Sequence, residues 1–209
     1  MIHDAISYPT SGDDWPIKIG ILAGLSLFSW LIVPIFLVAG YYVRILETTA
    51  EGGSELPEWS DWGDLFVDGL KLVAVAVAYM LVPIVVAAIS FFLLRDVSVA
   101  LAGLLVFVVT ATFYYLLPAS LANHAAVGTL AAGFDVGTLA RVLTSVEYAM
   151  AWLLALGIMV IGGIVAAIVS LVPILGWIAG PVIAATVYVA ALHVYGIGYR
   201  NAVGGSAVL

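Results

Sequence analysis

Residues 72–94 read LVAVAVAYMLVPIVVAAISFFLL, and residues 97–117 read VSVALAGLLVFVVTATFYYLL. Neither run contains a charged side chain, and each is long enough for a helix that crosses a bilayer, which needs about 20 apolar residues. Between them lie Arg95 and Asp96, which mark a tight turn. The pair therefore predicts two antiparallel membrane-spanning helices joined by a short connection.

Three further apolar runs flank this pair, and a span tolerates a short polar margin at its ends. The predicted spans are about Ile17–Val43, Leu70–Leu94, Val97–Leu117, Tyr148–Ser170 and Ile178–Tyr199. The fold class is therefore all-α, a polytopic transmembrane helical bundle of about five spans with interfacial amphipathic helices. We divide the chain into an N-terminal interfacial segment (1–16), a single transmembrane domain (17–200) and a flexible tail (201–209).

The composition supports the membrane prediction and excludes several functions. Hydrophobic residues make up 65% of the 209 residues and charged residues 9%, whereas a soluble domain carries roughly 25% charged residues. The absence of cysteine excludes disulfides, thiolate metal sites and cysteine nucleophiles. A net charge of −7 without any basic block argues against nucleic acid as a partner. The acid excess, with only two lysines, is typical of a salt-adapted organism.

The cations predict an orientation. Five spans place the termini on opposite sides, with Arg44, Lys71, Arg141 and Arg200 on one side and Lys18 and Arg95 on the other. The positive-inside rule then predicts a plasma-membrane protein with its N-terminus outside and its C-terminus in the cytoplasm. A rival topology breaks the first span at Pro34 into a re-entrant pair and leaves both termini inside.

Two amphipathic stretches lie on the predicted inner side. Between Trp59 and Lys71, the residues Asp61, Asp64 and Asp68 share one helical face, and Trp59 and Trp62 lie on the opposite face. Such a helix would lie in the interface with its rings among the headgroups. The stretch 135–146 is similar.

An offset of 74 residues carries Asp61 onto Asp135 and Tyr41 onto Tyr115. This predicts two repeats, at about 17–94 and 97–170, followed by a fifth span. Each Asp would cap a helix start, where a carboxylate accepts backbone N–H groups.

Few residues are candidates for a catalytic, proton-transfer or metal-binding role. His193 lies inside the fifth span, so it is either a functional ionisable group or a neutral imidazole hydrogen-bonded to a neighbouring helix. The carboxylates between Glu55 and Asp68 could bind a hard cation, but a solvated helix face is the favoured interpretation. No charged residue lies near the middle of a span, which argues against proton pumps and ion-coupled transporters.

Small residues suggest where helices approach each other. Gly20-x-x-x-Gly24 and Gly176-x-x-x-Gly180 would allow close contact within the chain or between copies. Pro34 and Pro83 would kink their helices.

The polar ends of the spans carry a familiar pattern. Gly40-Tyr41-Tyr42-Val43-Arg44 and the run LPEWSDWGDLFVDGLK at residues 56–71 resemble an archaeal membrane family catalogued as domain of unknown function 4013. Shorter similarities occur at Ser7–Pro9, Asp13–Trp15, Ala132–Asp135 and Gly198–Arg200. The resemblance implies a haloarchaeal plasma-membrane protein and implies no activity.

We therefore expect a non-enzymatic multi-pass membrane protein that acts as a scaffold or a lipid- or partner-binding module. Its partners would be the lipid bilayer and a second copy or a membrane protein, without any cofactor or metal. The alternative is a permease or channel subunit for a neutral or weakly polar solute. The candidate functional or interfacial residues are Arg44, Trp59, Asp61, Trp62, Asp64, Asp68, Asp135, His193 and Arg200.

Overall fold

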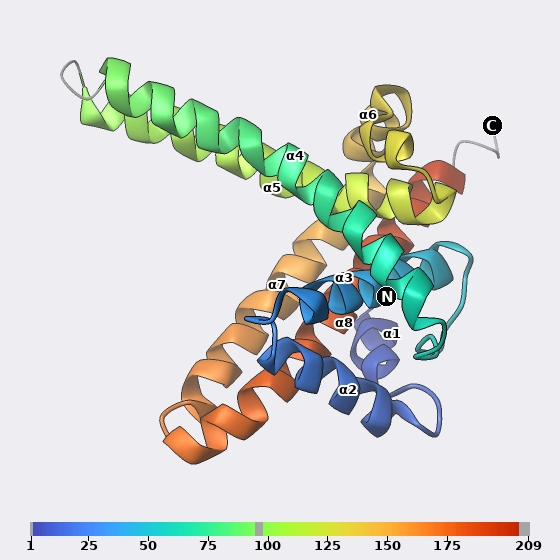
Figure 1. Ribbon diagram of the computed structural model, residues 1–209. Coiled ribbons are helices and arrows are strands. Elements are labelled where there is room, and N and C mark those ends of the chain that lie inside the picture. Colours follow the sequence, from blue (N-terminus) through green and yellow to red (C-terminus); the bar gives the residue numbers. More distant parts are fainter. Residues whose placement is uncertain (1, 95–97, 205–209) are drawn as a thin grey trace.

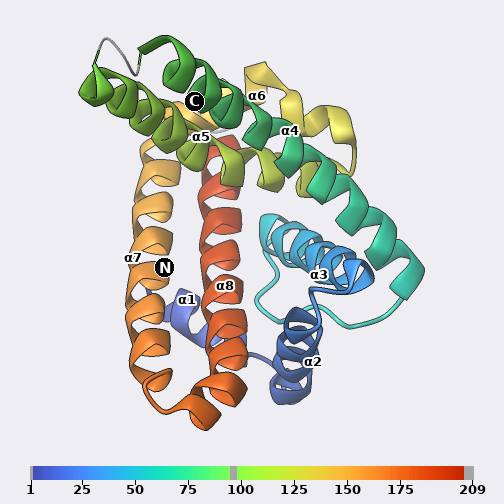
Figure 2. The same cartoon turned by 60° about the vertical axis from the view of Figure 1, so that its left-hand side comes forward.

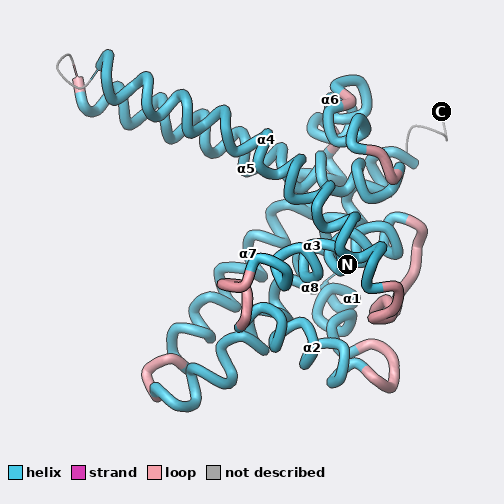
Figure 3. The backbone as a smooth tube through the Cα atoms, viewed as in Figure 1, coloured by secondary structure: helices cyan, strands magenta, loops and turns pink. Residues whose placement is uncertain are grey.

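The computed structural model describes residues 2–94 and 98–204, and every regular element among them is helical (Figures 1 and 3). The elements are α1 (Ile2–Ser7), η1 (Tyr8–Thr10), α2 (Trp15–Leu27), α3 (Ile32–Ala50), α4 (Trp62–Leu94), α5 (Val99–Val127), η2 (Leu130–Phe134), α6 (Val136–Thr144), α7 (Val146–Val169) and α8 (Pro173–Gly204). Five of these helices, α3, α4, α5, α7 and α8, are long and apolar enough to cross a membrane. The predicted all-α class with five such helices is confirmed.

Two long antiparallel hairpins dominate the molecule. Figures 1 and 2 show α4 running beside α5 and α7 beside α8, with the two hairpins diverging from a common end. Helices α1, α2, α3 and α6 gather near that end. The distal parts of the hairpins expose large apolar side chains, such as Phe92 and Trp177, as expected for surfaces that face lipid.

The single helix predicted at Ile17–Val43 is wrong. Helix α2 ends at Leu27, a turn at 28–31 reverses the chain, and α3 starts at Ile32. Pro34 therefore lies in the first turn of α3, where its missing N–H leaves no hydrogen bond unmade. The contacting pair α2 and α3 forms a third, shorter hairpin.

Two predicted polar connections are largely helical. Helix α3 continues through Arg44 to Ala50, and α5 continues through Pro118 to Val127. Because proline has no N–H, the carbonyl of Tyr114 loses its helical partner. The indole Nε1–H of Trp152, on α7, donates to that oxygen at 3.4 Å, so the helix can continue past the proline.

The two predicted interfacial helices differ from each other. Only 136–144 forms a separate amphipathic helix, α6, whereas Trp62–Lys71 is the first part of the continuous helix α4. The apolar face of this part packs on α3 through Leu65 and Gly69, which are buried. A Cβ on Gly69 would fall on the carbonyl of Phe36, so the two backbones are in direct contact.

Both described ends of the chain lie at the same end of the bundle, away from the hairpin tips (Figure 1). The Tyr8 ring stacks on His193 at 3.7 Å between centroids, near the C-terminal end of α8. The α2–α3 hairpin brings the described ends together, as in the rival topology with a re-entrant pair, and the sides of the membrane on which the ends lie stay a prediction. Asn201–Gly204 of the predicted flexible tail are helical, and the rest of that tail lies outside the described residues.

Candidate functional site: the polar end of the bundle

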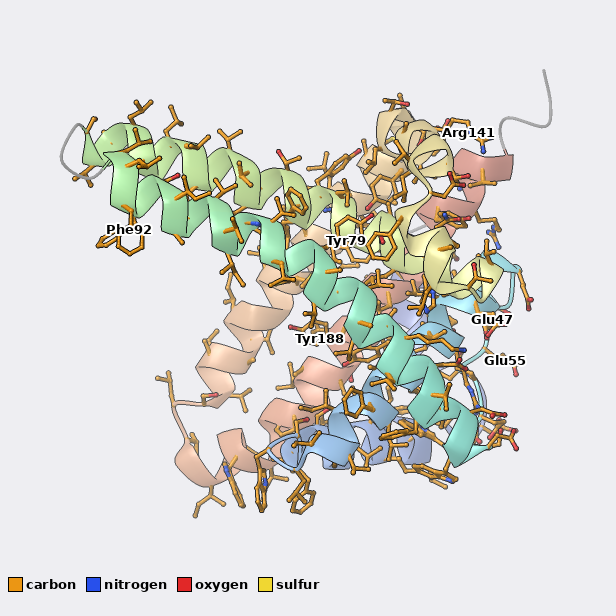
Figure 4. All side chains as sticks on the ribbon, turned by 45° about the horizontal axis from the view of Figure 1, so that its top comes forward. Glu47, Glu55, Tyr79, Phe92, Arg141 and Tyr188 are labelled. Carbon is orange, nitrogen blue, oxygen red and sulfur yellow. The ribbon has the colours of Figure 1, made fainter. Side chains whose placement is uncertain are left out.

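Charged side chains gather at the end where the three hairpins meet. Figure 4 shows Glu47, Glu55 and Arg141 at this end and Phe92 near the far tip of α4. The described charged residues all belong to segments at this end, namely 4–18, 44–71, 135–147 and Arg200. The tight turn predicted at Arg95 and Asp96 lies outside the described residues.

The backbone of residues 55–60, which we call the clamped loop, is held by side chains from three other elements. Its carbonyls accept hydrogen bonds from Tyr8 (3.2 Å), Lys18 (2.9 Å), Tyr41 (3.0 Å) and Arg44 (3.0 and 2.8 Å). Loop carbonyls cannot use a helical or sheet partner, so these donors satisfy groups that would otherwise need water. These hydrogen bonds give the LPEWSDW motif a structural role as the clamped loop, and they give Tyr41 and Arg44 a structural role as donors to its carbonyls.

Lys18 is the least expected member of the clamp. Its side chain is only 6% exposed and contacts Glu58 at 2.6 Å and Asp14 at 3.1 Å. Burial lowers the pKa of Lys18, but the hydrogen bonds with Glu58 and Asp14 outweigh burial, so the pKa is raised. The prediction that Lys18 lies on the side opposite Arg44 is wrong, because both side chains bind the same loop.

An aromatic stack closes the loop. Trp59 stacks on Tyr41 at 4.0 Å and on Trp62 at 5.6 Å, and its indole N–H donates to the Lys18 carbonyl at 3.1 Å. Trp59 thus belongs to the loop and not to the helix predicted to start there. Trp62 remains 47% exposed at the start of α4 and is the aromatic side chain that this stack presents at the surface.

The predicted Asp residues have different roles. Asp135 accepts the N–H groups of Gly137 and Thr138 at 3.0 and 3.4 Å, which confirms its capping role. Hydrogen bonds from Thr138 lower the pKa of Asp135. Asp61 instead adopts a left-handed backbone with φ of 47°, and its carbonyl, not its carboxylate, accepts the Leu65 N–H.

The remaining carboxylates are exposed or paired on the surface. Asp64 is exposed, and Asp68 pairs with Lys71 at 2.8 Å. Among the described residues, no group of three His, Asp or Glu side chains is placed to hold a metal ion.

His193 and Arg200 join α8 to α3. His193 is buried, and its Nδ1 lies 2.9 Å from the Thr49 hydroxyl. Arg200 donates to the Thr49 carbonyl at 3.3 Å. Burial raises the pKa of Tyr8, which covers the His193 ring, to about 12. Of the two interpretations of His193, the structure shows the hydrogen bond to a neighbouring helix.

The structure also contains cavities that the sequence analysis did not predict. One, of about 440 Å³, lies at the polar end beside Asn123 and Tyr199. Another, of about 210 Å³, lies between α3, α5, α7 and α8 and is lined by four tyrosines. Phenol groups inside predicted spans were the sequence signal that could have revealed the second cavity.

The predicted residues therefore form one main unit and one separate feature. Arg44, Trp59, Asp61 and Trp62 belong to the clamped loop and its border, with His193 and Arg200 linked to α3 through Thr49. Asp135 lies apart, at the start of α6. The hydrogen bonds of this unit hold the clamped loop and α8 to α3.

The comparisons with known proteins give a family and no activity. No curated protein and no solved structure matches the chain. A family model described as "Protein of unknown function (DUF4013)" matches residues 27–171. The matched part runs from the last residue of α2 to just beyond the end of α7 and includes the clamped loop. The similarities at Ser7–Pro9, Asp13–Trp15 and Gly198–Arg200 lie outside it. Because the match covers well over half of its length, the chain belongs to the DUF4013 family of proteins of unknown function.

Proposed function

We propose that this chain is a non-enzymatic, multi-pass integral membrane protein that acts as a scaffold, with its polar end as the binding surface for a membrane partner protein. One observation carries the proposal. Tyr8, Lys18, Tyr41 and Arg44 bind the carbonyls of the clamped loop, so these side chains build a rigid surface. A prearranged surface loses little conformational freedom when a partner binds.

The charges favour a protein partner over lipid headgroups. The exposed side chains on and beside the clamped loop include Glu51, Glu55, Glu58, Asp61 and Asp64. These carboxylates would repel anionic headgroups, because like charges repel when they lie within about a Debye length of each other. Trp62 supplies an exposed aromatic side chain of the kind that anchors protein interfaces.

The proposed orientation places the polar end in the cytoplasm, with both chain ends on that side. Lys18, Arg44, Lys71, Arg141 and Arg200 lie at this end, whereas Arg95 lies in the connection between α4 and α5. The positive-inside rule assigns the end with five cations to the cytoplasm. In this arrangement α4, α5, α7 and α8 cross the membrane. The α2–α3 hairpin enters it partway, since 13 residues of α2 span roughly 20 Å.

We also propose a haloarchaeal plasma membrane as the location. A net charge of −7 and the presence of only two lysines support a salt-adapted source. The resemblance of the LPEWSDW motif to archaeal sequences points in the same direction.

Photo-crosslinking in cells tests the scaffold. A benzophenone amino acid replaces Glu55 or Asp64, both exposed at the polar end, or Val160, exposed on α7 as a lipid-facing control. The two polar-end positions should each give a discrete protein adduct, and Val160 should not. Identical adduct patterns at all three positions, or none, would overturn the proposal, and solute uptake by reconstituted protein without adducts would favour the permease alternative.

A matched pair of arginine variants then tests the clamp. Arg44→Ala should weaken the adduct several-fold, because it frees the carbonyls of Glu58 and Ser60. Arg141→Ala should leave the adduct unchanged, because the Arg141 side chain hydrogen-bonds to Thr138 on its own helix and, among the described residues, to no carbonyl of the clamped loop. Equal adducts from both variants would show that the clamp is irrelevant to binding.

A further inference from the structure

The cavity at the fork of the two long hairpins has an almost wholly apolar surface. It measures about 210 Å³, and side chains from α3, α5, α7 and α8 line it. Four tyrosines belong to this lining, but they present ring carbons to the space and not their hydroxyls. The rest of the wall is mainly aliphatic, with Leu46, Leu117, Leu121 and Leu192 as its largest members. Such a surface can recognise hydrocarbon but offers no hydrogen bonds to a polar ligand.

Two smaller cavities extend this central one along both hairpins. One, of about 70 Å³, lies between α4 and α5 and shares Tyr114 and Leu117 with it. The other, of about 150 Å³, lies between α7 and α8 and shares Met159 and Tyr188 with it. We call the three cavities together the fork groove. Because neighbouring cavities share parts of their walls, the groove is elongated, and its shape matches a flexible chain better than a compact ring.

The membrane placement proposed above puts the groove at the depth of lipid tails. Tyr195 and Tyr188 precede Arg200 by five and twelve residues on α8, which is roughly 7.5 and 18 Å along a helix. With Arg200 at the membrane surface, the central cavity reaches close to the middle of a hydrocarbon core about 30 Å thick. Lipid headgroups lie at the edge of that core, so the molecules that surround the groove at this depth are hydrocarbon tails.

We propose that the fork groove binds one hydrocarbon tail of a membrane lipid, which fills the space between the diverging hairpins (Figure 2). Protein interiors leave few voids larger than a water molecule, and apolar cavities stay dry but admit apolar molecules. Four helices would surround the tail in the central cavity, whereas the outer face of a hairpin offers only two. This tail should therefore stay bound when the surrounding lipid is removed. The inference rests on the membrane placement proposed above and is independent of any partner protein.

Native mass spectrometry of the full chain, released from micelles of tetraethylene glycol monooctyl ether, can count the bound lipid. The probe is palmitoyl lysophosphatidylcholine, which has a single tail and should occupy one saturable site. Exchange of its choline for glycerol should leave the occupancy unchanged, and glycerophosphocholine, which has the headgroup without a tail, should not bind. Adducts that increase linearly without saturation would reflect loosely adhering lipid and would overturn the proposal, as would binding that follows the headgroup.

A matched pair of glycine variants on α7 locates the tail. A Cβ at Gly157 or at Gly163 meets open space, so both positions accept a larger side chain. Gly163 lines the groove and Gly157 does not. Gly163→Leu should therefore lower the lipid occupancy several-fold, and Gly157→Leu should leave it unchanged. Ala191→Leu, which adds bulk to the wall of the central cavity, should lower the occupancy at least as much. Undiminished occupancy in either groove variant would overturn the proposal.

Thermal unfolding in the same detergent confirms that each variant is folded before occupancies are compared. A second copy of the chain seated in the fork would appear in the same spectra as a lipid-free dimer and would overturn the proposal. Thiol labelling of the two chain ends, described below, tests the membrane placement separately, so a failure of that placement is distinguishable from a failure of the tail assignment.

Discussion

Lys18 shows how a single side chain organises the polar end. It is buried, yet its ammonium group reaches two carboxylates and the carbonyl of Leu56. A buried ammonium group is tolerated only when its donors are used. Lys18 has three donors and three oxygen partners, so the desolvation cost is offset, and the first turn of α2 is tied to the clamped loop.

Lys18→Met should lower the free energy of unfolding by about 2 kcal/mol, since hydrogen bonds to charged groups contribute roughly 1.5–3 kcal/mol. Lys71→Met is the matched control, because the partly exposed Lys71–Asp68 pair should contribute less than about 1 kcal/mol. Thermal or denaturant unfolding in detergent measures both. The raised pKa of Lys18 means that its contribution is complete at neutral pH and is lost only as the pH rises above the ordinary lysine value of 10.5. Equal losses for the two variants would contradict this role.

Asp61 and Asp135 occupy corresponding positions of the predicted repeat but should respond oppositely to substitution. Asp135→Ala removes the cap of α6 and should lower the melting temperature. Asp61→Gly should leave it unchanged or raise it, because glycine adopts the left-handed backbone of this position without strain.

The acid response separates the two residues further. The folded-state pKa of Asp135 is lowered, so its stabilisation is present at neutral pH and is lost as the pH falls through that value. The difference between Asp135→Ala and the wild type should therefore vanish in acid. A difference that persists there would exclude charge-assisted capping.

At the scale of elements, the crossing of α3 and α4 depends on two glycines. A Cβ at Gly40 would fall on the carbonyl of Leu65, and one at Gly69 on that of Phe36. Backbone atoms cannot move aside as a flexible side chain can. The helices would have to separate along the part of α4 that follows the clamped loop.

Gly40→Ala and Gly69→Ala should each destabilise the protein by about 1–3 kcal/mol, the usual cost of overpacking. Gly20→Ala in α2 is the control, because a Cβ there meets open space; helix propensity should make it neutral or stabilising by about 0.5–1 kcal/mol. Unfolding of the three variants in one detergent provides the comparison. A loss at Gly20 as large as at Gly69 would refute the close crossing.

At the scale of the whole molecule, the three hairpins place both described ends of the chain at the polar end of the bundle (Figure 1). The chain has no cysteine, so single cysteines can report accessibility in an otherwise unchanged protein. Suitable exposed positions are Asp13, Glu55 and Asn201 at the polar end and Leu171 at the tip of the α7–α8 hairpin.

A membrane-impermeant maleimide should label the first three positions only in inverted vesicles and Leu171 only in right-side-out vesicles. Labelling of Asp13→Cys and Asn201→Cys from opposite sides would contradict the proposed orientation and would support the five-span topology. Protection of Leu171→Cys in both preparations would show that the α7–α8 hairpin does not cross the membrane.

The sequence by itself determined the helical class, the number of long apolar helices and the cap at Asp135. These follow from local properties: uncharged runs of sufficient length, and a side chain that bonds to N–H groups two and three residues away. The family motif could also be recognised without a structure, because it is a contiguous string of residues.

Only the tertiary structure decided which glycines touch, where Lys18 points and whether the first apolar run is one helix or two. Gly20 and Gly24 match the G-x-x-x-G pattern but meet nothing, whereas Gly40 and Gly69 match no pattern and lie in direct backbone contact. Such contacts join segments far apart in the chain. Their identity depends on how whole helices cross, which no local spacing of residues specifies.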